Sequence, residues 1–300
     1  MAEAARQANV LVIGAGPAGI SAAAQLQRYG LRPVVFEAGA PGGLLRNANL
    51  VENYPGFPDG IRGPALAARM AAHLAELEVR VVRREAEQAG WDGERFWLLA
   101  EGERWIAPWL AIASGTEALR LEAPPIPAEL ESRVFYEVWP LGDAQGLQAA
   151  VIGGGDAAFD YALNLARANR VTILNRSRQR RCLDLLYERA LACPQIEYRA
   201  ETRLQALEAG TGGRLRLRLE SAGGEARLEA DALLIAIGRQ PRLGFLDASL
   251  RERLAELERR GRLHRIGDVN NGLFRQAAIA CGDGLRAAMA IYQCFLGGEK

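Results

Sequence analysis

A glycine-rich motif near the start of the chain constrains the fold more than any other feature. Residues 9–13 are mostly branched and apolar, which is typical of a buried strand in a parallel sheet. Gly14, Gly16 and Gly19 follow in the spacing G-x-G-x-x-G, and residues 20–27 then predict a helix. The first glycine allows a tight turn, the second lets backbone amides approach a pyrophosphate, and the third lets helix and strand pack closely. The motif therefore predicts a nucleotide-binding strand–turn–helix unit.

The next strand adds a second feature of such a unit. Residues 33–36 predict an apolar strand that ends in Glu37, 18 residues after the last glycine. A carboxylate there can accept hydrogen bonds from both hydroxyls of an adenosine ribose. Residues 38–58 hold so much Gly and Pro that we expect a loop without regular structure, shaped to lie against another group.

The opening pattern returns in the second half of the chain. Residues 149–152 predict a short apolar strand, residues 153–158 give G-x-G-x-x-A, and residues 159–168 predict the following helix. A further strand is expected at residues 171–174. Two such units in one chain predict an α/β protein with two dinucleotide-binding, Rossmann-like domains. The pattern leaves open whether the second unit binds a nucleotide or is a degenerate copy.

The second unit differs at the residue that selects its nucleotide. Its second strand ends in Asn175 rather than an acid, and Arg176, Arg178, Arg180 and Arg181 follow. Without a carboxylate a 2′-phosphate is not repelled, and guanidinium groups can hold it bidentately. This favours NADP(H) over NAD(H); the alternative is a solvated basic turn.

The remaining segments predict ordinary α/β elements. We expect a helix at 64–77, strands within 78–100 around a turn at 91–93, and strands at 109–113 and 232–238. A charged helix is expected at 251–262, a strand reaching 267–269, and a final helix ending near Phe295. His264 and Arg265 are unusual in a strand that should be apolar, and Arg265 is a candidate to pair with a carboxylate or a phosphate.

Composition and charge exclude several classes of protein. The chain is 49% hydrophobic and 24% charged with a net charge of +1, so it has ample core and no bias toward nucleic acid. No apolar run approaches the ~20 residues of a membrane span. Residues 1–8 lead directly into the first strand without an apolar segment, so we expect a cytoplasmic protein.

The cysteines offer neither a metal site nor an obvious disulfide. Cys182, Cys193, Cys281 and Cys294 form no C-x-x-C, and with two histidines no zinc spacing appears. Cys182 and Cys193 are expected on one helix, roughly 16 Å apart, beyond disulfide reach. Cys281 and Cys294 fail in the same way. We expect buried packing cysteines, with pairing across the fold or across a dimer left open.

The motifs together resemble the low-molecular-weight thioredoxin reductases and the thioredoxin-reductase-like ferredoxin–NADP reductases. The resemblance covers nearly the whole chain: the two glycine motifs, E-N-Y-P-G at 52–56, A-I-G at 236–238, G-D-V at 267–269 and F-R-Q-A at 274–277. In such enzymes the first unit binds FAD, and the second, inserted into it, binds NADPH. The resemblance implies an FAD-binding domain of residues 1–115 and 242–300 and an NAD(P)H-binding-like domain of residues 116–241, joined by two crossing strands. It also implies a homodimer whose domains swing against each other.

The same resemblance implies the binding residues. Asp268 would bond the flavin ribitol chain, and the helix starting near Gln276 would aim its amides at the flavin N1–C2=O edge, where negative charge grows on reduction. The residues implied for FAD are Gly14, Gly16, Pro17, Ala18, Gly19, Glu37, Gly42, Gly43, Leu44, Asn53, Gly115, Gly267, Asp268, Arg275, Gln276 and Ala277. Those implied for NADPH or another second nucleotide are Gly153, Gly155, Asp156, Ala157, Arg176 and Arg181.

The chain departs from the thioredoxin reductases at their redox centre. Those enzymes carry a C-x-x-C just upstream of the second glycine motif, where residues 134–140 here read V-F-Y-E-V-W-P, with Glu137 and Pro140 near the cysteine positions. No dithiol can form there, which excludes thioredoxin reduction by that route. Asn175 and Ser177 also replace the family's usual histidine and arginine, while Arg176 and Arg181 remain.

Three hypotheses for function follow. The first is an FAD-dependent oxidoreductase without a dithiol, in which the flavin itself is the reactive group and electrons pass between NADPH and a small carrier such as ferredoxin or flavodoxin. The second is a diflavin or disulfide oxidoreductase that does not use NADPH, with its own or a second FAD stacked on Trp139 and cysteines elsewhere. The third is a non-enzymatic, flavin-bound sensor. No metal, nucleic acid or membrane partner is expected.

Overall fold

The computed structural model describes residues 5–298, which divide into two units. The first unit holds the residues up to Arg46, Leu50–Glu117 and the residues from Gln240 on, and the second holds Asn47–Asn49 and Ala118–Arg239. Strands β9 (Thr116–Ala118) and β18 (Arg239–Pro241) pair where the chain passes between the units. The expected absence of an N-terminal apolar segment concerns in part residues 1–4, which lie outside the described residues.

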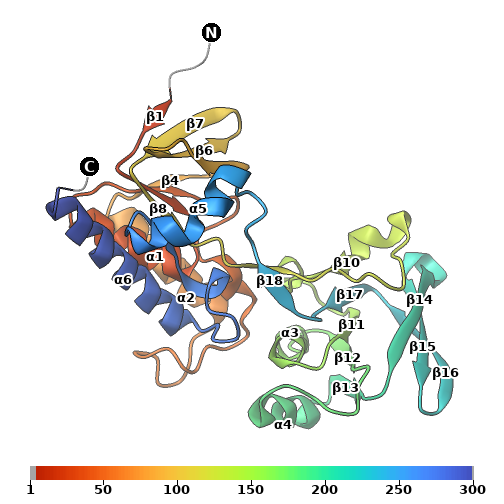
Figure 1. The fold of residues 1–300 in the computed structure, drawn as a ribbon. Helices are drawn as coiled ribbons and strands as arrows, with labels where there is room; N and C mark the ends of the chain where they lie inside the picture. Colours follow the sequence, from red (N-terminus) through yellow and green to blue (C-terminus); the bar gives the residue numbers. More distant parts are fainter. Residues whose placement is uncertain (1–4, 299–300) are drawn as a thin grey trace. The chain divides into compact units, whose positions relative to one another are not determined.

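The first unit is built on a five-stranded parallel sheet in the order β19-β8-β2-β3-β4 (Figure 1). Its strands are β2 (Val10–Ile13), β3 (Val34–Phe36), β4 (Arg80–Val82), β8 (Trp109–Ile112) and β19 (Leu263–Arg265). Every residue of β2, β3 and β8 is buried. Strands of a parallel sheet that is covered on both faces are expected to be apolar throughout, as these are.

Two hydrophobic clusters cover the faces of this sheet. One packs helices α1 (Pro17–Arg28), α2 (Gly63–Glu76) and α6 (Ala277–Leu296) together. The other joins the sheet to α5 (Ala248–Arg259) and to a second sheet of order β1-β7-β6-β5. The strands of that sheet are β1 (Arg6–Gln7), β5 (Gln88–Trp91), β6 (Phe96–Ala100) and β7 (Glu103–Ala107).

The second unit repeats the parallel arrangement in the order β10-β17-β11-β12-β13 (Figure 1). Its strands are β10 (Val134–Phe135), β11 (Gln148–Ile152), β12 (Arg170–Leu174), β13 (Ile196–Arg199) and β17 (Ala232–Ile235), and its helices are α3 (Asp156–Leu165) and α4 (Asp184–Ala192). An antiparallel sheet of β14 (Arg203–Ala209), β15 (Leu215–Ser221) and β16 (Gly224–Ala230) packs its leucines against this sheet. The predicted α/β fold with two Rossmann-like domains is confirmed.

Several element boundaries were predicted wrongly. Trp91 belongs to β5, so its turn comes later, and β1 and β7 were not predicted. The last strand ends at Arg265, and Gly267–Val269 form a 3₁₀ turn instead. The loop after Glu37 contains a 3₁₀ turn at Gly43–Asn47, because Gly42 and Gly43 adopt positive φ angles that let the chain curl tightly.

Candidate functional site

In the glycine turn of the first unit, two glycines pack closely against backbone atoms and the third borders open space. A Cβ on Gly14 would lie 2.3 Å from the Ala113 carbonyl oxygen, and one on Gly19 would lie 1.9 Å from the Gly14 oxygen. Neither glycine can be replaced without moving backbone. A Cβ on Gly16, in contrast, would meet no atom of the described residues within 4 Å. Gly16 also caps α1 without a side-chain bond, so the N–H groups of Ala18 and Gly19, which follow Pro17, lie in the first turn of a helix that borders open space.

Glu37 stands at the carboxyl end of β3 beside this turn. Its two carboxylate oxygens accept hydrogen bonds from the backbone N–H groups of Ala15 and Gly39, each at 2.8 Å. Two such charge-assisted bonds fix the orientation of the carboxylate at the edge of the sheet. Its remaining lone pairs are available to other donors.

The loop after Glu37 folds back onto the glycine turn. Gly42 donates its N–H to the Ala15 oxygen at 2.7 Å, and a Cβ on Gly43 would lie 3.0 Å from the Gly16 Cα. Leu44 follows in the same 3₁₀ turn. The structure therefore brings Gly42 and Gly43 to the glycine turn. Gly115 adopts a φ of 65° just beyond β8 and accepts the Arg242 N–H at 3.1 Å.

The amino end of α6 is the second part of the site in this unit. Gln276 precedes the helix without a side-chain cap, and its Oε1 accepts the Asn53 amide at 2.8 Å. The first-turn N–H groups, Ala277 included, therefore carry partial positive charge toward a ligand. The Nε atom of Arg275 is buried without a hydrogen-bond partner among the described residues.

A short turn ties α6 to α1. A Cβ on Gly267 would lie 2.8 Å from the Ala18 Cβ, which places the Gly267-Asp268 turn against the start of α1. Asp283 Oδ2 accepts the Gly267 N–H at 3.2 Å and the Asn271 amide at 2.6 Å. Sequence reasoning missed Asp283, although an acid within an otherwise small and apolar stretch of helix was a usable signal.

Tyr54 and Cys281 form a further contact near the start of α1. The Tyr54 hydroxyl hydrogen-bonds with Cys281 Sγ at 3.6 Å, and this thiol donates to the Pro17 oxygen at 3.8 Å. Burial, reinforced by the Cys281 hydrogen bond, raises the pKa of Tyr54 to about 12. The hydroxyl therefore stays protonated at neutral pH.

The residues of the first unit fit FAD. Gly16 leaves room for a pyrophosphate at a helix N-terminus, and Glu37 is held where an adenosine ribose would lie. The orphaned Arg275 Nε and the uncapped amino end of α6 both need an acceptor, which phosphate or flavin oxygens would supply.

The second unit has the same division between packed and open glycines. A Cβ on Gly153 would lie 2.5 Å from the Ala236 oxygen, whereas one on Gly155 would meet no described atom within 4 Å. Gly155 precedes α3, whose first turn contains Asp156 and Ala157 and has no side-chain cap. Another dinucleotide pyrophosphate fits at this helix N-terminus.

Of the four arginines that follow β12, three are exposed and one is held by an ion pair. Arg176, Arg178 and Arg181 are exposed, and their guanidinium groups make no ion pair within residues 5–298. Arg180 instead pairs with Asp184 at 2.6 Å and lies 4.2 Å from the centre of the Tyr187 ring. Arg180 is therefore already used, and three arginines remain for an anion.

The resemblance to thioredoxin reductases places a cysteine near Glu137, and in this structure that residue forms an ion pair. Glu137 Oε1 accepts a hydrogen bond from Arg239 at 2.8 Å, and Glu137 Oε2 accepts from the Tyr161 hydroxyl at 3.2 Å and the Asn47 amide at 2.6 Å. Burial and the Glu137 charge raise the pKa of Tyr161. Trp139, which is 49% exposed, follows in a 3₁₀ turn and donates its backbone N–H to Asn47 Oδ1 at 3.1 Å.

The four cysteines are all free. Helix α4 spans Asp184–Ala192, so the expectation that Cys182 and Cys193 lie on one helix is wrong; they flank it. Burial raises the pKa of the Cys182 thiol. No thiol pair replaces the missing dithiol within the described residues.

His264 and Arg265 have structural partners. Arg265 makes two hydrogen bonds to Glu258, at 2.7 and 3.0 Å, so it pairs with a carboxylate and not a phosphate. Burial lowers the pKa of His264, and its Nε2 lies 3.2 Å from the Gly261 oxygen. Neither residue belongs to the candidate site. In residues 5–298 no cluster of metal-binding side chains occurs, and no helix is long and apolar enough to cross a membrane.

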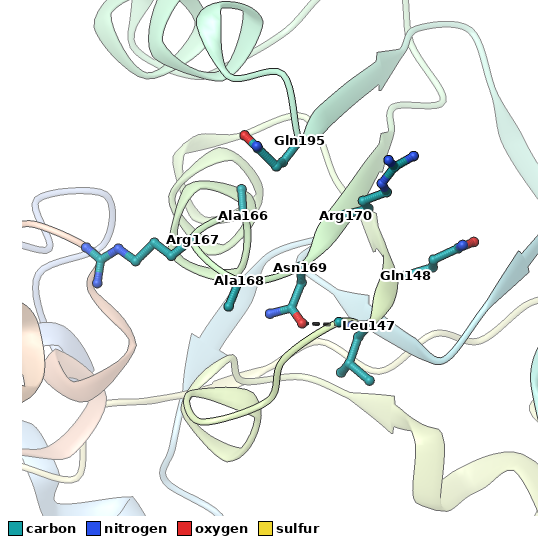
Figure 2. Close-up of a pocket in the computed structure, with 9 residues that line it drawn as sticks. Leu147, Gln148, Ala166, Arg167, Ala168, Asn169, Arg170 and Gln195 are labelled. Carbon is teal, nitrogen blue, oxygen red and sulfur yellow. Dashed lines mark hydrogen bonds between the residues drawn. The ribbon is translucent and has the colours of Figure 1, made fainter.

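A hollow of about 400 Å³ in the second unit lies away from this site (Figure 2). Gln148 and Arg170, which line it, begin β11 and β12, whereas nucleotides bind at the carboxyl ends of such strands. The side chain of Asn169 beneath it is satisfied by Leu147, Ala144 and Leu165. We therefore do not assign the hollow to nucleotide binding.

Comparisons with known proteins agree with the fold. A model of the pyridine nucleotide-disulphide oxidoreductase family matches residues 8–278. NADPH-dependent thioredoxin reductase 3 of Arabidopsis thaliana is 32% identical over 94% of this chain, which spans 57% of that longer protein. Thioredoxin reductase of Streptomyces coelicolor is 32% identical, with 94% of this chain and 92% of the relative covered.

A solved structure shows the same likeness. Thioredoxin reductase of Lactococcus lactis matches with a TM-score of 0.82 at 27% identity, covering 97% of this chain and 99% of that one. Both glycine motifs lie within the matched family residues, and the family resemblance inferred from sequence is confirmed. The chain thus belongs to the pyridine nucleotide-disulphide oxidoreductase family and is a thioredoxin-reductase-like flavoprotein with FAD as its cofactor.

Proposed function

We propose that this flavoprotein transfers electrons between NADPH and a small redox carrier of the ferredoxin or flavodoxin type, without a cysteine pair on the route. The observation that supports the proposal is the Glu137–Arg239 ion pair, which lies where the resemblance to thioredoxin reductases implies a cysteine. With no sulfur relay there, electrons leave the flavin directly. When bound, FAD supplies hydride acceptance from a nicotinamide and electron donation to an acceptor.

The first unit would hold FAD through three features. The glycine turn and α1 would bind the pyrophosphate, Glu37 would accept the ribose hydroxyls, and the amino end of α6 would face the flavin N1–C2=O edge. Asp268 would bond the ribitol chain, and Gly42, Gly43, Leu44, Asn53 and Gly115 would line the cofactor.

The second unit would hold NADPH. Gly153, Gly155, Asp156 and Ala157 would surround its pyrophosphate, while Arg176 and Arg181 would bind its 2′-phosphate. The absence of a carboxylate at Asn175 supports a phosphorylated ribose. The same arginines would attract an acidic carrier protein by charge complementarity.

The expected homodimer and cytoplasmic location belong to this proposal. An exposed apolar stripe on α6, with Leu285 and Met289 at 44% and 55% exposure, supports a protein contact on that helix. Four unpaired cysteines fit a reducing compartment.

A second candidate rests on Trp139, whose half-exposed indole could stack on a flavin in a protein that does not use NADPH. Flavin counted per subunit after denaturation separates the two, because the main proposal requires one FAD and the diflavin form requires two.

The test of the proposed function is electron transfer under anaerobic conditions. Purified enzyme with NADPH is mixed with ferredoxin, with flavodoxin, or with oxidised thioredoxin, and reduction of each carrier is followed separately. We expect reduction of a ferredoxin or flavodoxin and none of thioredoxin. Reduction of thioredoxin alone would contradict the proposal.

A further inference from the structure

Asn175 directly follows β12, and its buried side chain lies beneath the loop that carries the arginines. Its Oδ1 accepts the Ser177 N–H at 3.1 Å, and its Nδ2 donates to the Gln179 oxygen at 3.2 Å and the Tyr198 hydroxyl at 3.0 Å. Only 5% of the residue is exposed. A Cβ on Gly154 would lie 2.7 Å from the same Oδ1, so the glycine turn also packs against this side chain.

Two further bonds fasten the loop to the glycine turn. Arg181 donates its N–H to the Gly154 oxygen at 2.7 Å, and Asp156 Oδ1 accepts the Leu183 N–H at 2.8 Å. The segment from Asn175 to Leu183 is thus held at its start by the Asn175 side chain and toward its end by the bonds of Arg181 and Leu183. These last two bonds link it to the glycine turn and to the first residue of α3.

This fastening matters because the loop presents three cationic side chains. Arg176, Arg178 and Arg181 are exposed on it, while Arg180 is occupied by Asp184. A bidentate guanidinium–phosphate contact depends on geometry, and a loop ordered in advance loses less entropy when the anion binds. Removal of the support beneath the loop would weaken a phosphate contact without removing any arginine.

We propose that Asn175 is a positioning residue that sets the preference for a nucleotide carrying a 2′-phosphate. It would act through the backbone of Ser177 and Gln179 and would not itself touch the nucleotide. The inference deepens the proposed function, on which it rests for the use of NADPH. It assigns specificity to a buried amide as well as to the arginines above it.

The test compares Asn175→Ala with Asn169→Ala in the holoenzyme. Asn169, drawn in Figure 2, is a matched control, because it is also 5% exposed and its side chain also makes three hydrogen bonds. It precedes β12, whereas Asn175 follows the same strand. The probes are adenosine 2′,5′-bisphosphate and adenosine 5′-monophosphate, measured by calorimetry. Rapid-mixing measurements of flavin reduction by NADPH and NADH accompany them.

We expect Asn175→Ala to weaken binding of the bisphosphate about tenfold, the loss of roughly one good phosphate contact. Binding of the monophosphate and the limiting rate of flavin reduction should stay within about twofold of wild type. Asn169→Ala should change neither probe. Tyr198→Phe, which removes one hydroxyl and keeps the ring packed on Phe159, should give a smaller loss in the same direction and serves if Asn175→Ala does not fold.

Bisphosphate binding that is the same in wild type, Asn175→Ala and Tyr198→Phe would overturn the inference. A loss in Asn169→Ala equal to that in Asn175→Ala would also overturn it. A wild-type protein that binds both probes equally would overturn it as well. If bisphosphate binding depends on Asn175 but NADPH does not reduce the flavin, the inference stands and the proposed function fails. The two failures are therefore distinguishable.

Discussion

The close contact between α1 and α6 predicts opposite effects for two glycines on one helix. A Cβ on Gly284 would lie 2.2 Å from the Ala18 oxygen and 2.9 Å from the Ala22 nitrogen, both backbone atoms of α1. Ordinary contact begins near 3.4 Å, so the helices would have to separate by about 1 Å. Overpacking of this kind costs about 1–3 kcal/mol, and immovable backbone places Gly284→Ala at the upper end. Gly282, two residues earlier, would meet no described atom within 4 Å.

The expected shifts can be stated as melting temperatures of the holoenzyme. At roughly 2–4 °C per kcal/mol, Gly284→Ala should lower the midpoint by about 6–12 °C. Gly282→Ala should raise it by about 2–4 °C, because alanine is favoured over glycine by about 1 kcal/mol in an exposed helix. The assay is the increase in flavin fluorescence as FAD leaves the heated protein, which reports on the first unit. A Gly284→Ala midpoint equal to or above wild type would refute the packing argument.

Three further predictions use single substitutions. Glu37→Gln leaves one acceptor oxygen for two backbone N–H groups, so the affinity for FAD, measured by titration of the apoprotein, should fall about 10–100-fold. The control is Glu87→Gln, at an exposed acid that also accepts a backbone N–H, and it should leave the affinity for FAD unchanged. Burial raises the pKa of Asp160 to about 6, so its ionisation weakens the fold as pH rises through 6; Asp160→Asn should add about 1–3 kcal/mol at pH 8 and little at pH 4 by urea unfolding. Glu137→Ala removes the carboxylate that pairs with Arg239, so the free energy of unfolding should fall by about 1–3 kcal/mol. An unchanged free energy of unfolding would contradict this prediction.

The glycine spacing predicted both nucleotide units because the steric reason for each glycine is local. Gly14, Gly19 and Gly153 sit where a Cβ would collide with backbone, and Gly16 and Gly155 sit where it would not. Such constraints are visible in sequence, since no other residue meets them. The roles of individual residues in binding stay predictions.

Other features depend on contacts between distant parts of the chain, or on sequence patterns too weak to assign a role. In the sequence, Asn175 stands where an acid would select NAD(H), and nothing nearby indicates that its side chain is buried. Its contacts with Tyr198 and Gly154 form only in the folded sheet. Asp283 holds the Gly267 turn from a separate helix. Strand β7 was missed because its sequence, E-R-W-I-A, gives too short an alternation to be distinguished from a loop.

The central claim is that electrons pass through the flavin with no thiol relay, and one measurement tests it most directly. A variant with all four cysteines replaced by serine is mixed anaerobically with NADPH and with a ferredoxin or flavodoxin that the wild type reduces, while the flavin band and the carrier are both recorded. We expect flavin bleaching and carrier reduction at the wild-type rates, because every cysteine is free and Glu137 is held in an ion pair with Arg239. No bleaching of the wild-type flavin band, or carrier reduction that disappears with the cysteines, would contradict the central claim.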